Sequence, residues 1–100
     1  MGNPLTEMLS IEKELHAERA SALHRVAQGL EKLLEELNGL ETEVSLSAGS
    51  EKDRVIRRYE EVRALAGRQL WYLIVQREAV GLTHHEDVYE IHKVPRSLTY

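Results

Sequence analysis

Residues 23 to 44, LHRVAQGLEKLLEELNGLETEV, carry the pattern that decides the fold. Apolar side chains recur here at alternating steps of three and four residues, which is the a/d seam of a coiled-coil helix. The seam consists of Leu23, Val26, Leu30, Leu33, Leu37, Leu40 and Val44. The stretch therefore predicts a long helix that packs one narrow face against another helix.

The start of this helix is marked by Asn3 and Pro4. Asparagine is a favoured N-cap, and proline suits the first helical position because its missing N–H has no partner there. Asn38-Gly39 would suit a left-handed cap that ends the helix early. Because Leu40 and Val44 keep the phase of the seam, we predict a helix over 4–44 that frays somewhere between 38 and 45.

The seam loses its heptad phase before Leu23. Stepping back from Leu23 by fours and threes lands on polar side chains, whereas a different apolar stripe runs along the first turns. The polar positions are Arg19, His16 and Glu12, and the apolar ones are Met8, Ile11 and Leu15. The first turns are therefore expected to meet a different neighbour.

A second helix is predicted over 51–80. The small and polar residues 45–50, SLSAGS, are typical of a connector between antiparallel helices, and Ser50 to Asp53 resembles a capping box. One apolar face follows, and Gly81 ends the helix. The face contains Val55, Tyr59, Val62, Ala66 and Leu73. The two helices together predict an antiparallel hairpin.

A short third helix is predicted over 84–92, because Thr83 to Glu86 is a second capping-box pattern. Val94-Pro95 must leave helical space, so 93–100 is expected to be an extended tail. If the hairpin turns at 45–50, residue 80 lies near residue 15 and residues 4–14 extend past helix two. We expect the third helix to cover this overhang.

The run Trp71 to Val75, inside RQLWYLIVQRE at 68–78, places five consecutive apolar residues on every side of a helical turn. A hairpin buries only one of these sides. The competing interpretation, a β-strand, lacks a second strong strand to pair with. We therefore predict that two copies pair in a dimeric four-helix arrangement. Its interface residues are Leu70, Trp71, Leu73, Ile74 and Val75.

Composition limits the function. The chain has 100 residues, enough for one domain, a net charge of −4 and no cysteine, which excludes disulfides, thiolate metal sites and cysteine nucleophiles. No stretch is long and apolar enough to span a bilayer. The negative charge makes nucleic-acid binding an unfavoured hypothesis, although helix two carries a basic stripe. We expect these arginines to form ion pairs within the chain, where helix one offers acids nearby, or between subunits. They are Arg54, Arg57, Arg58, Arg63, Arg68 and Arg77.

A histidine-rich segment is the one candidate for metal binding. It contains His84, His85, Asp87 and His92, but on a helix only His84 and Asp87 have a usable ligand spacing. The Glu-x-x-His pattern of di-iron bundles and the His-Glu-x-x-His zinc motif are both absent. We favour capping or solvated side chains, and expect no cofactor.

The stretches RQLWYLIVQREAVGL and VYEIHKVP, within residues 68 to 95, resemble a family of short bacterial helical proteins known only as a domain of unknown function. The resemblance implies a bacterial, cytoplasmic and mostly helical protein, and it carries over no catalytic residue. The chain shows no catalytic or phosphate-binding motif. The sequence thus predicts an all-α homodimer that acts as an interaction or scaffolding module. A metal- or ligand-binding protein, with or without enzymatic activity, is the alternative.

Overall fold

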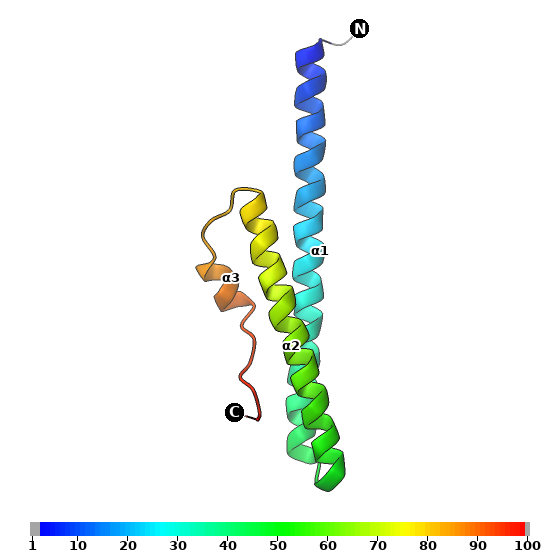
Figure 1. The fold of residues 1–100 in the computed structure, drawn as a ribbon. Coiled ribbons are helices and arrows are strands. Elements are labelled where there is room, and N and C mark those ends of the chain that lie inside the picture. Colours follow the sequence, from blue (N-terminus) through cyan, green and yellow to red (C-terminus); the bar gives the residue numbers. More distant parts are fainter. Residues whose placement is uncertain (1–2, 100) are drawn as a thin grey trace.

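The computed structural model describes residues 3–99 and contains three helices. These are α1 (Pro4–Leu46), α2 (Gly49–Ala79) and α3 (Glu86–Ile91), and the described residues include no strand. The two long helices lie side by side and antiparallel, and α1 extends well beyond the end of α2 (Figure 1). The predicted all-α hairpin is confirmed.

The N-terminus of α1 begins as the sequence indicates. Asn3 is the N-cap, and its Oδ1 accepts a hydrogen bond of 3.1 Å from the amide of Leu5. At the other end the helix continues to Leu46 and ignores Asn38-Gly39 as a stop. The seam positions Leu40 and Val44 that follow are half-buried, so ending the helix at residue 38 would remove their apolar contact with the rest of the hairpin.

The connector between the long helices is shorter than predicted. Only Ser47 and Ala48 lie outside the helices, and α2 begins at Gly49. Gly49 has φ of +61°, a left-handed conformation that glycine adopts without steric cost. The predicted capping box at Ser50 is wrong, since Ala48 is the N-cap and no side chain caps the helix. The reversal of direction takes place at the glycine instead.

The C-terminus of α2 forms a Schellman motif at Gly81. The amide of Leu82 donates to the carbonyl of Arg77 at 3.0 Å, and the amide of Gly81 donates to Glu78 at 3.0 Å. Gly81 itself has φ of +89°. These are the two hydrogen bonds that define the motif, and they satisfy carbonyls at the helix end. The predicted stop is confirmed.

The core lies between α1 and α2. Leu30 and Leu37 of α1 and Val62 and Ala66 of α2 have no exposed surface, and Tyr59 is 1% exposed. These residues belong to one apolar cluster that α3 completes. The other members are Leu73, Ile74 and Val88, with Leu23, Val26, Ala27, Leu33, Leu34, Leu40, Leu70 and Val94 packed against them.

Gln69 contributes the one hydrogen bond in which α2 reaches the backbone of α1. Its Nε2 donates to the carbonyl of Val26 at 3.1 Å. Gly29 makes room for this side chain, because a Cβ atom there would lie 3.2 Å from the same nitrogen. The glycine and the glutamine together fix the register of the two helices at this level.

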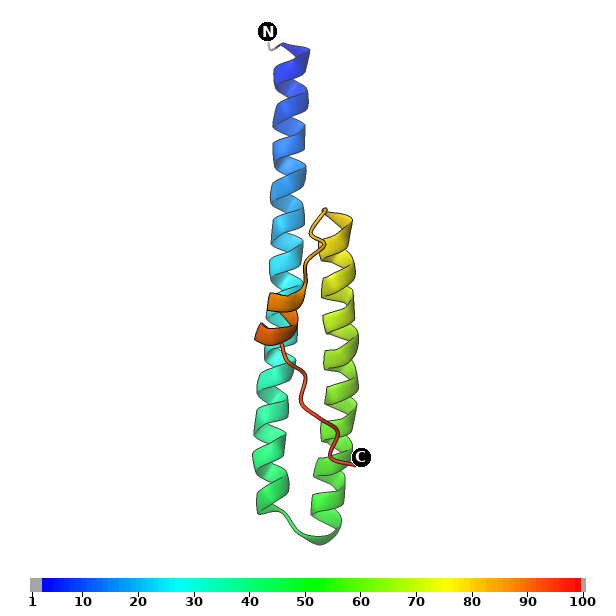
Figure 2. The ribbon, with the colours of Figure 1, turned by 90° about the vertical axis from the view of Figure 1, so that its left-hand side faces the viewer.

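Residues 82–99, which we call the C-terminal arm, fold back along the hairpin towards its loop (Figure 2). Val88 of α3 is buried in the core, and after α3 the chain runs without regular structure to residue 99. Helix α3 begins at Glu86, two residues later than predicted, and has no side-chain cap. The last predicted tail residue, Tyr100, lies outside the described residues.

The arm is held by polar contacts from α2. The hydroxyl of Tyr59 donates to the carbonyl of Arg96 at 3.0 Å, and Nε of Arg63 donates to the carbonyl of Pro95 at 2.8 Å. The carboxylate of Glu60 accepts from the hydroxyl of Ser97 and the amide of Leu98, at 2.9 and 2.7 Å. The arm therefore covers the side of α2 that carries Tyr59, Glu60 and Arg63, next to the side that packs on α1.

The prediction that the third helix covers the overhang of α1 is wrong. The Schellman turn sends the arm towards the loop, and its contacts to Tyr59, Glu60 and Arg63 keep it there. Every described residue from Asn3 to Ser21 is exposed. The first turns of α1 thus project past the hairpin with no neighbour (Figure 1).

Candidate interaction surface

The apolar run 71–75 on α2 is divided between the interior and the surface. Leu73 and Ile74 are buried in the chain's own core, and Leu70 is half-buried against it. Trp71 is 68% exposed and Val75 is 36% exposed. The sequence predicts a second copy as the cover for the far side of this turn, but Leu73 and Ile74 are covered within the chain itself. The C-terminal arm, which belongs to the same chain, supplies part of the cover that a second copy was expected to supply.

The exposed part of the run belongs to a surface that we call the Trp71 face, made of Ala64, Gly67, Trp71, Tyr72 and Val75. Ala64, Gly67 and Val75 lie within about 40° of Trp71 around the helix, because each residue turns it by 100°. All five residues are exposed, and all but Tyr72, which lies about 100° further round the helix, point away from the buried Val62 and Ala66. Two small residues beside a large aromatic leave room for another helix to approach closely.

A second apolar surface lies on the overhang of α1, and we call it the overhang face. Its residues are between 45% and 61% exposed, although each is large and apolar. They are Leu5, Met8, Leu9, Ile11 and Leu15. Such a contiguous patch on a small protein is typical of a contact surface.

The overhang face continues the side of α1 that packs on α2. Leu5, Met8 and Leu15 precede the seam residues Leu23, Val26 and Leu33 by eighteen residues each. Eighteen residues are five full turns at 3.6 residues per turn, so each pair points in the same direction. The predicted change of stripe comes from counting in heptads, which drift by about 20° per repeat against a straight helix. An eighteen-residue comparison of the sequence reveals the continuity.

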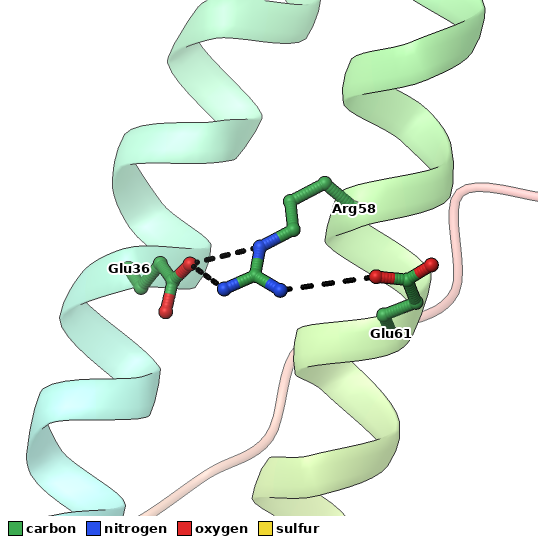
Figure 3. Close-up of polar contacts among 3 residues, drawn as sticks. All are labelled: Glu36, Arg58 and Glu61. Carbon is green, nitrogen blue, oxygen red and sulfur yellow. Dashed lines mark hydrogen bonds and ion pairs between the residues drawn. The ribbon is translucent and has the colours of Figure 1, made fainter.

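The arginines of α2 divide their contacts between α1, α2 and the arm. Arg58 pairs across the hairpin with Glu36, donating from Nε at 3.1 Å and from Nη2 at 2.8 Å, and lies 3.8 Å from Glu61 (Figure 3). Arg54 pairs with Glu51 of its own helix at 3.5 Å. These groups are about half exposed, so each pair contributes on the order of 0–1 kcal/mol.

Arg63 and Arg77 bind backbone rather than acids. Arg63 holds Pro95, as described above, and Arg77 donates from Nη2 to the carbonyl of His84 at 3.0 Å. The predicted internal ion pairing is therefore confirmed for Arg54 and Arg58, whereas Arg63 and Arg77 bind backbone carbonyls within the chain. Their partners lie on the arm, whose direction the sequence does not specify.

The four candidate metal ligands do not converge. His85 lies against Glu78 and Arg77 at the end of α2, whereas the ring of His92 contacts the carboxylate of Glu31 on α1. His84 and Asp87 are exposed. Within residues 3–99, no group of three or more potential ligands is placed to hold a metal ion. The contacts of His85 and His92 attach α3 to both long helices, so these two side chains fasten the arm.

Tyr59 is a buried side chain of α2 whose hydroxyl group contacts the C-terminal arm. Burial raises the pKa of its phenol above the ordinary value of 10.0, and the carboxylates of Glu41 and Glu60 raise it further, while Arg63 acts in the opposite direction. The hydroxyl therefore stays protonated and donates to Arg96 across the neutral range.

Comparisons with known proteins identify no relative, since no protein-family model, curated protein or solved structure matches the chain. The resemblance of residues 68 to 95 to a bacterial family stays a prediction. Among the described residues, the long helices are too polar for any of them to cross a membrane. The two exposed apolar surfaces are therefore the features of the molecule that bear on its function.

Proposed function

We propose that this protein is a small interaction or scaffolding module without catalytic activity, and that it works as a homodimer. The observation that carries the proposal is the exposure of Trp71 at 68%, on a face where Tyr72 and Val75 are also exposed. Tryptophan is strongly enriched among residues that dominate binding energy, because it buries a large apolar area with few rotatable bonds.

In the proposed dimer, two hairpins pack through their Trp71 faces into a four-helix arrangement with two-fold symmetry. The face lies on α2, and its small residues Ala64 and Gly67 allow the two α2 helices to approach. A two-fold contact requires one self-complementary patch, in which Trp71 of each copy packs beside the small residues of the other.

The proposed setting is the cytoplasm of a bacterium. A chain without cysteine needs no oxidising compartment for folding, and the resemblance of residues 68 to 95 points to bacterial relatives. Protein surfaces are the proposed partners, and the acidic net charge of −4 makes nucleic acid an unfavoured one.

The chain's single tryptophan provides a direct test. Fluorescence emission of Trp71 reports its own burial, so dilution of the native protein should move the emission towards longer wavelength as the Trp71 face returns to solvent. Light scattering on the same dilution series should show the accompanying fall in mass towards the 11.5 kDa chain.

Trp71→Arg should abolish self-association through this face, because a charged group would be buried without a partner. Leu46→Arg is the matched control, since Leu46 is 83% exposed and lies beside the hairpin loop. Equal effects of the two variants on the mass, or an emission spectrum that does not change with concentration, would contradict the role of the Trp71 face.

A further inference from the structure

The overhang of α1 leaves an unfilled position beside it. Val80 and Leu82, at the end of α2, line a shallow cavity of about 230 Å³ together with His16, Ala20 and Leu23 of α1. Helix α2 therefore stops at the level of residues 16–23. Beyond that level, residues 4–15 of α1 extend for about 18 Å at 1.5 Å per residue, with open space on the side where α2 would continue.

The open space is lined by the overhang face, which continues the packed interface between α1 and α2. Leu5, Met8 and Leu15 point in the direction of Leu23, Val26 and Leu33, as the eighteen-residue spacing shows. A helix that continued the line of α2 would therefore pack on the overhang face, as α2 packs on Leu23, Val26 and Leu33 of α1. The missing element is a helix of about 18 Å.

We propose that the overhang face binds the overhang of a second copy, in an antiparallel end-to-end pair that is separate from the Trp71 face. Each overhang lies in the position beside the other, along the line of the partner's α2. The overhang of one copy occupies the open space beside the overhang of the other. The segment that fills the space and the segment that borders it therefore have the same length, and both overhang faces are covered. This self-complementarity is what a two-fold contact requires.

The ends of the helices favour this direction. In the antiparallel pair, the N-terminus of one α1 lies next to the C-terminus of the other copy's α2. A helix N-terminus carries a partial charge of about +0.5 and a helix C-terminus one of about −0.5. The two helix dipoles are therefore aligned head to tail, which stabilises this arrangement. Leu82, which is 43% exposed beside the shallow cavity, then gains an apolar neighbour from the first turn of the second copy's α1.

Glu12 is the side chain that limits the strength of this pair. It precedes the fully buried Leu30 by eighteen residues, so it lies on the midline of the overhang face. A carboxylate there loses hydration when a second copy covers it. Glu12→Leu should tighten end-to-end association by about tenfold or more, whereas weaker or unchanged association would contradict the geometry.

Light scattering on four proteins separates this proposal from the Trp71 dimer. The native protein should exceed two chains at high concentration, because two independent two-fold surfaces join more than two copies. Met8→Glu with Ile11→Glu should leave the Trp71 dimer, and Trp71→Arg should leave the end-to-end dimer. The combined variant should be a monomer. Thr6→Glu with Ser10→Glu, on the opposite side of the overhang, is the charge-matched control and should resemble the native protein.

The other outcomes show which of the two proposed contact surfaces, if either, is correct. A native dimer that only Trp71→Arg splits would overturn the end-to-end pair and retain the proposed function. A native dimer that only Met8→Glu with Ile11→Glu splits would retain the end-to-end pair and overturn the Trp71 face. A folded monomer at every concentration would overturn both. The overhang substitutions affect exposed residues, so circular dichroism should show unchanged folding.

Disulfide cross-linking tests the antiparallel direction, because the chain has no cysteine of its own. Leu9→Cys lies near the two-fold axis and should link to itself. Leu5→Cys should not link to itself, since the two copies of residue 5 lie about 14 Å apart along the helix axis. A disulfide needs Cα atoms within about 7 Å. A mixture of Leu5→Cys and Leu15→Cys should form the mixed dimer. Efficient self-linking of Leu5→Cys would indicate a parallel pair and overturn the proposal.

Discussion

Two segments of α1 have similar apolar patterns and opposite surroundings. Residues 23–44 pack against α2 and the arm, and they include Leu30 and Leu37 with no exposed surface. Residues 5–15 present leucine, methionine and isoleucine on the same side of the same helix, but all of them are exposed. The difference teaches that an amphipathic pattern specifies which side of a helix is to be covered, and not which part of the molecule covers it.

The largest effect expected from this comparison concerns leucine truncation. Leu37→Ala removes a fully buried side chain and should lower the free energy of unfolding by about 2–5 kcal/mol. Leu9→Ala removes a side chain that is 58% exposed and should change it by less than about 0.5 kcal/mol under conditions where the protein is a monomer. Urea titration followed by circular dichroism measures both. Similar losses would mean that the overhang is covered in the monomer.

The arm sharpens the comparison, because its cover reaches only the paired part of the hairpin. Tyr59→Phe removes the donor to the Arg96 carbonyl and should cost about 1 kcal/mol. It should also speed the hydrogen exchange of amides in residues 86–99 and leave residues 5–15 unchanged. Equal exchange in the arm of native and variant protein would show that Tyr59 does not hold it.

Titration of Tyr59 gives this contact a pH dependence. The folded pKa is raised above the ordinary value of 10.0, so the folded state keeps its proton where the unfolded state loses it. The stabilisation is therefore fully present below pH 10 and is lost as pH rises through the folded pKa. Thermal unfolding between pH 8 and about 11 should show a steeper fall for native protein than for Tyr59→Phe. Parallel profiles for the two proteins would contradict this assignment.

The smallest effect concerns the outer side of the paired segment, which resembles the overhang in meeting only solvent. Gly39 lies inside α1, and a Cβ atom there would have no neighbour within 4 Å. Gly39→Ala should therefore raise the free energy of unfolding by about 0.5–1 kcal/mol, through better helix propensity alone. Gly29→Ala is the informative contrast, because its Cβ would press on Gln69. A gain as large at Gly29 would show that Gln69 moves freely.

The long helices could be predicted from the sequence because their signals are local. The seam from Leu23 to Val44, the Asn3-Pro4 start and the Gly81 stop each specify structure within a few residues, and all three are confirmed. The boundaries failed where two local signals compete. Gly49 reverses the chain before the capping box at Ser50 can act, and the partial burial of Leu40 and Val44 overrides the Asn38-Gly39 stop.

The direction of the arm could not be predicted, because it depends on contacts between residues far apart in sequence. Arg63 binds a carbonyl 32 residues away and His92 contacts Glu31 across 61 residues. No periodicity records such pairs. The same limit applies to the site, since the run 71–75 indicates several neighbours without separating Leu73 and Ile74, which the chain covers itself, from Trp71, which it leaves exposed.

The two-residue connector at Ser47-Ala48 has a consequence for how the chain folds. Contacts between α1 and α2 next to the short connector close a loop of only a few residues, so they cost little conformational entropy. Each further contact adds only a few residues to the closed loop. The two helices should therefore begin to pair at the connector and continue towards the end of α2. Apart from His84 and His85, whose partners are seven or eight residues away, the polar contacts of the arm span 32 to 61 residues, which makes its docking a late event. Until then Leu73 and Ile74 lack part of their cover, and the newly formed hairpin is exposed to aggregation through the very turn that the arm later protects.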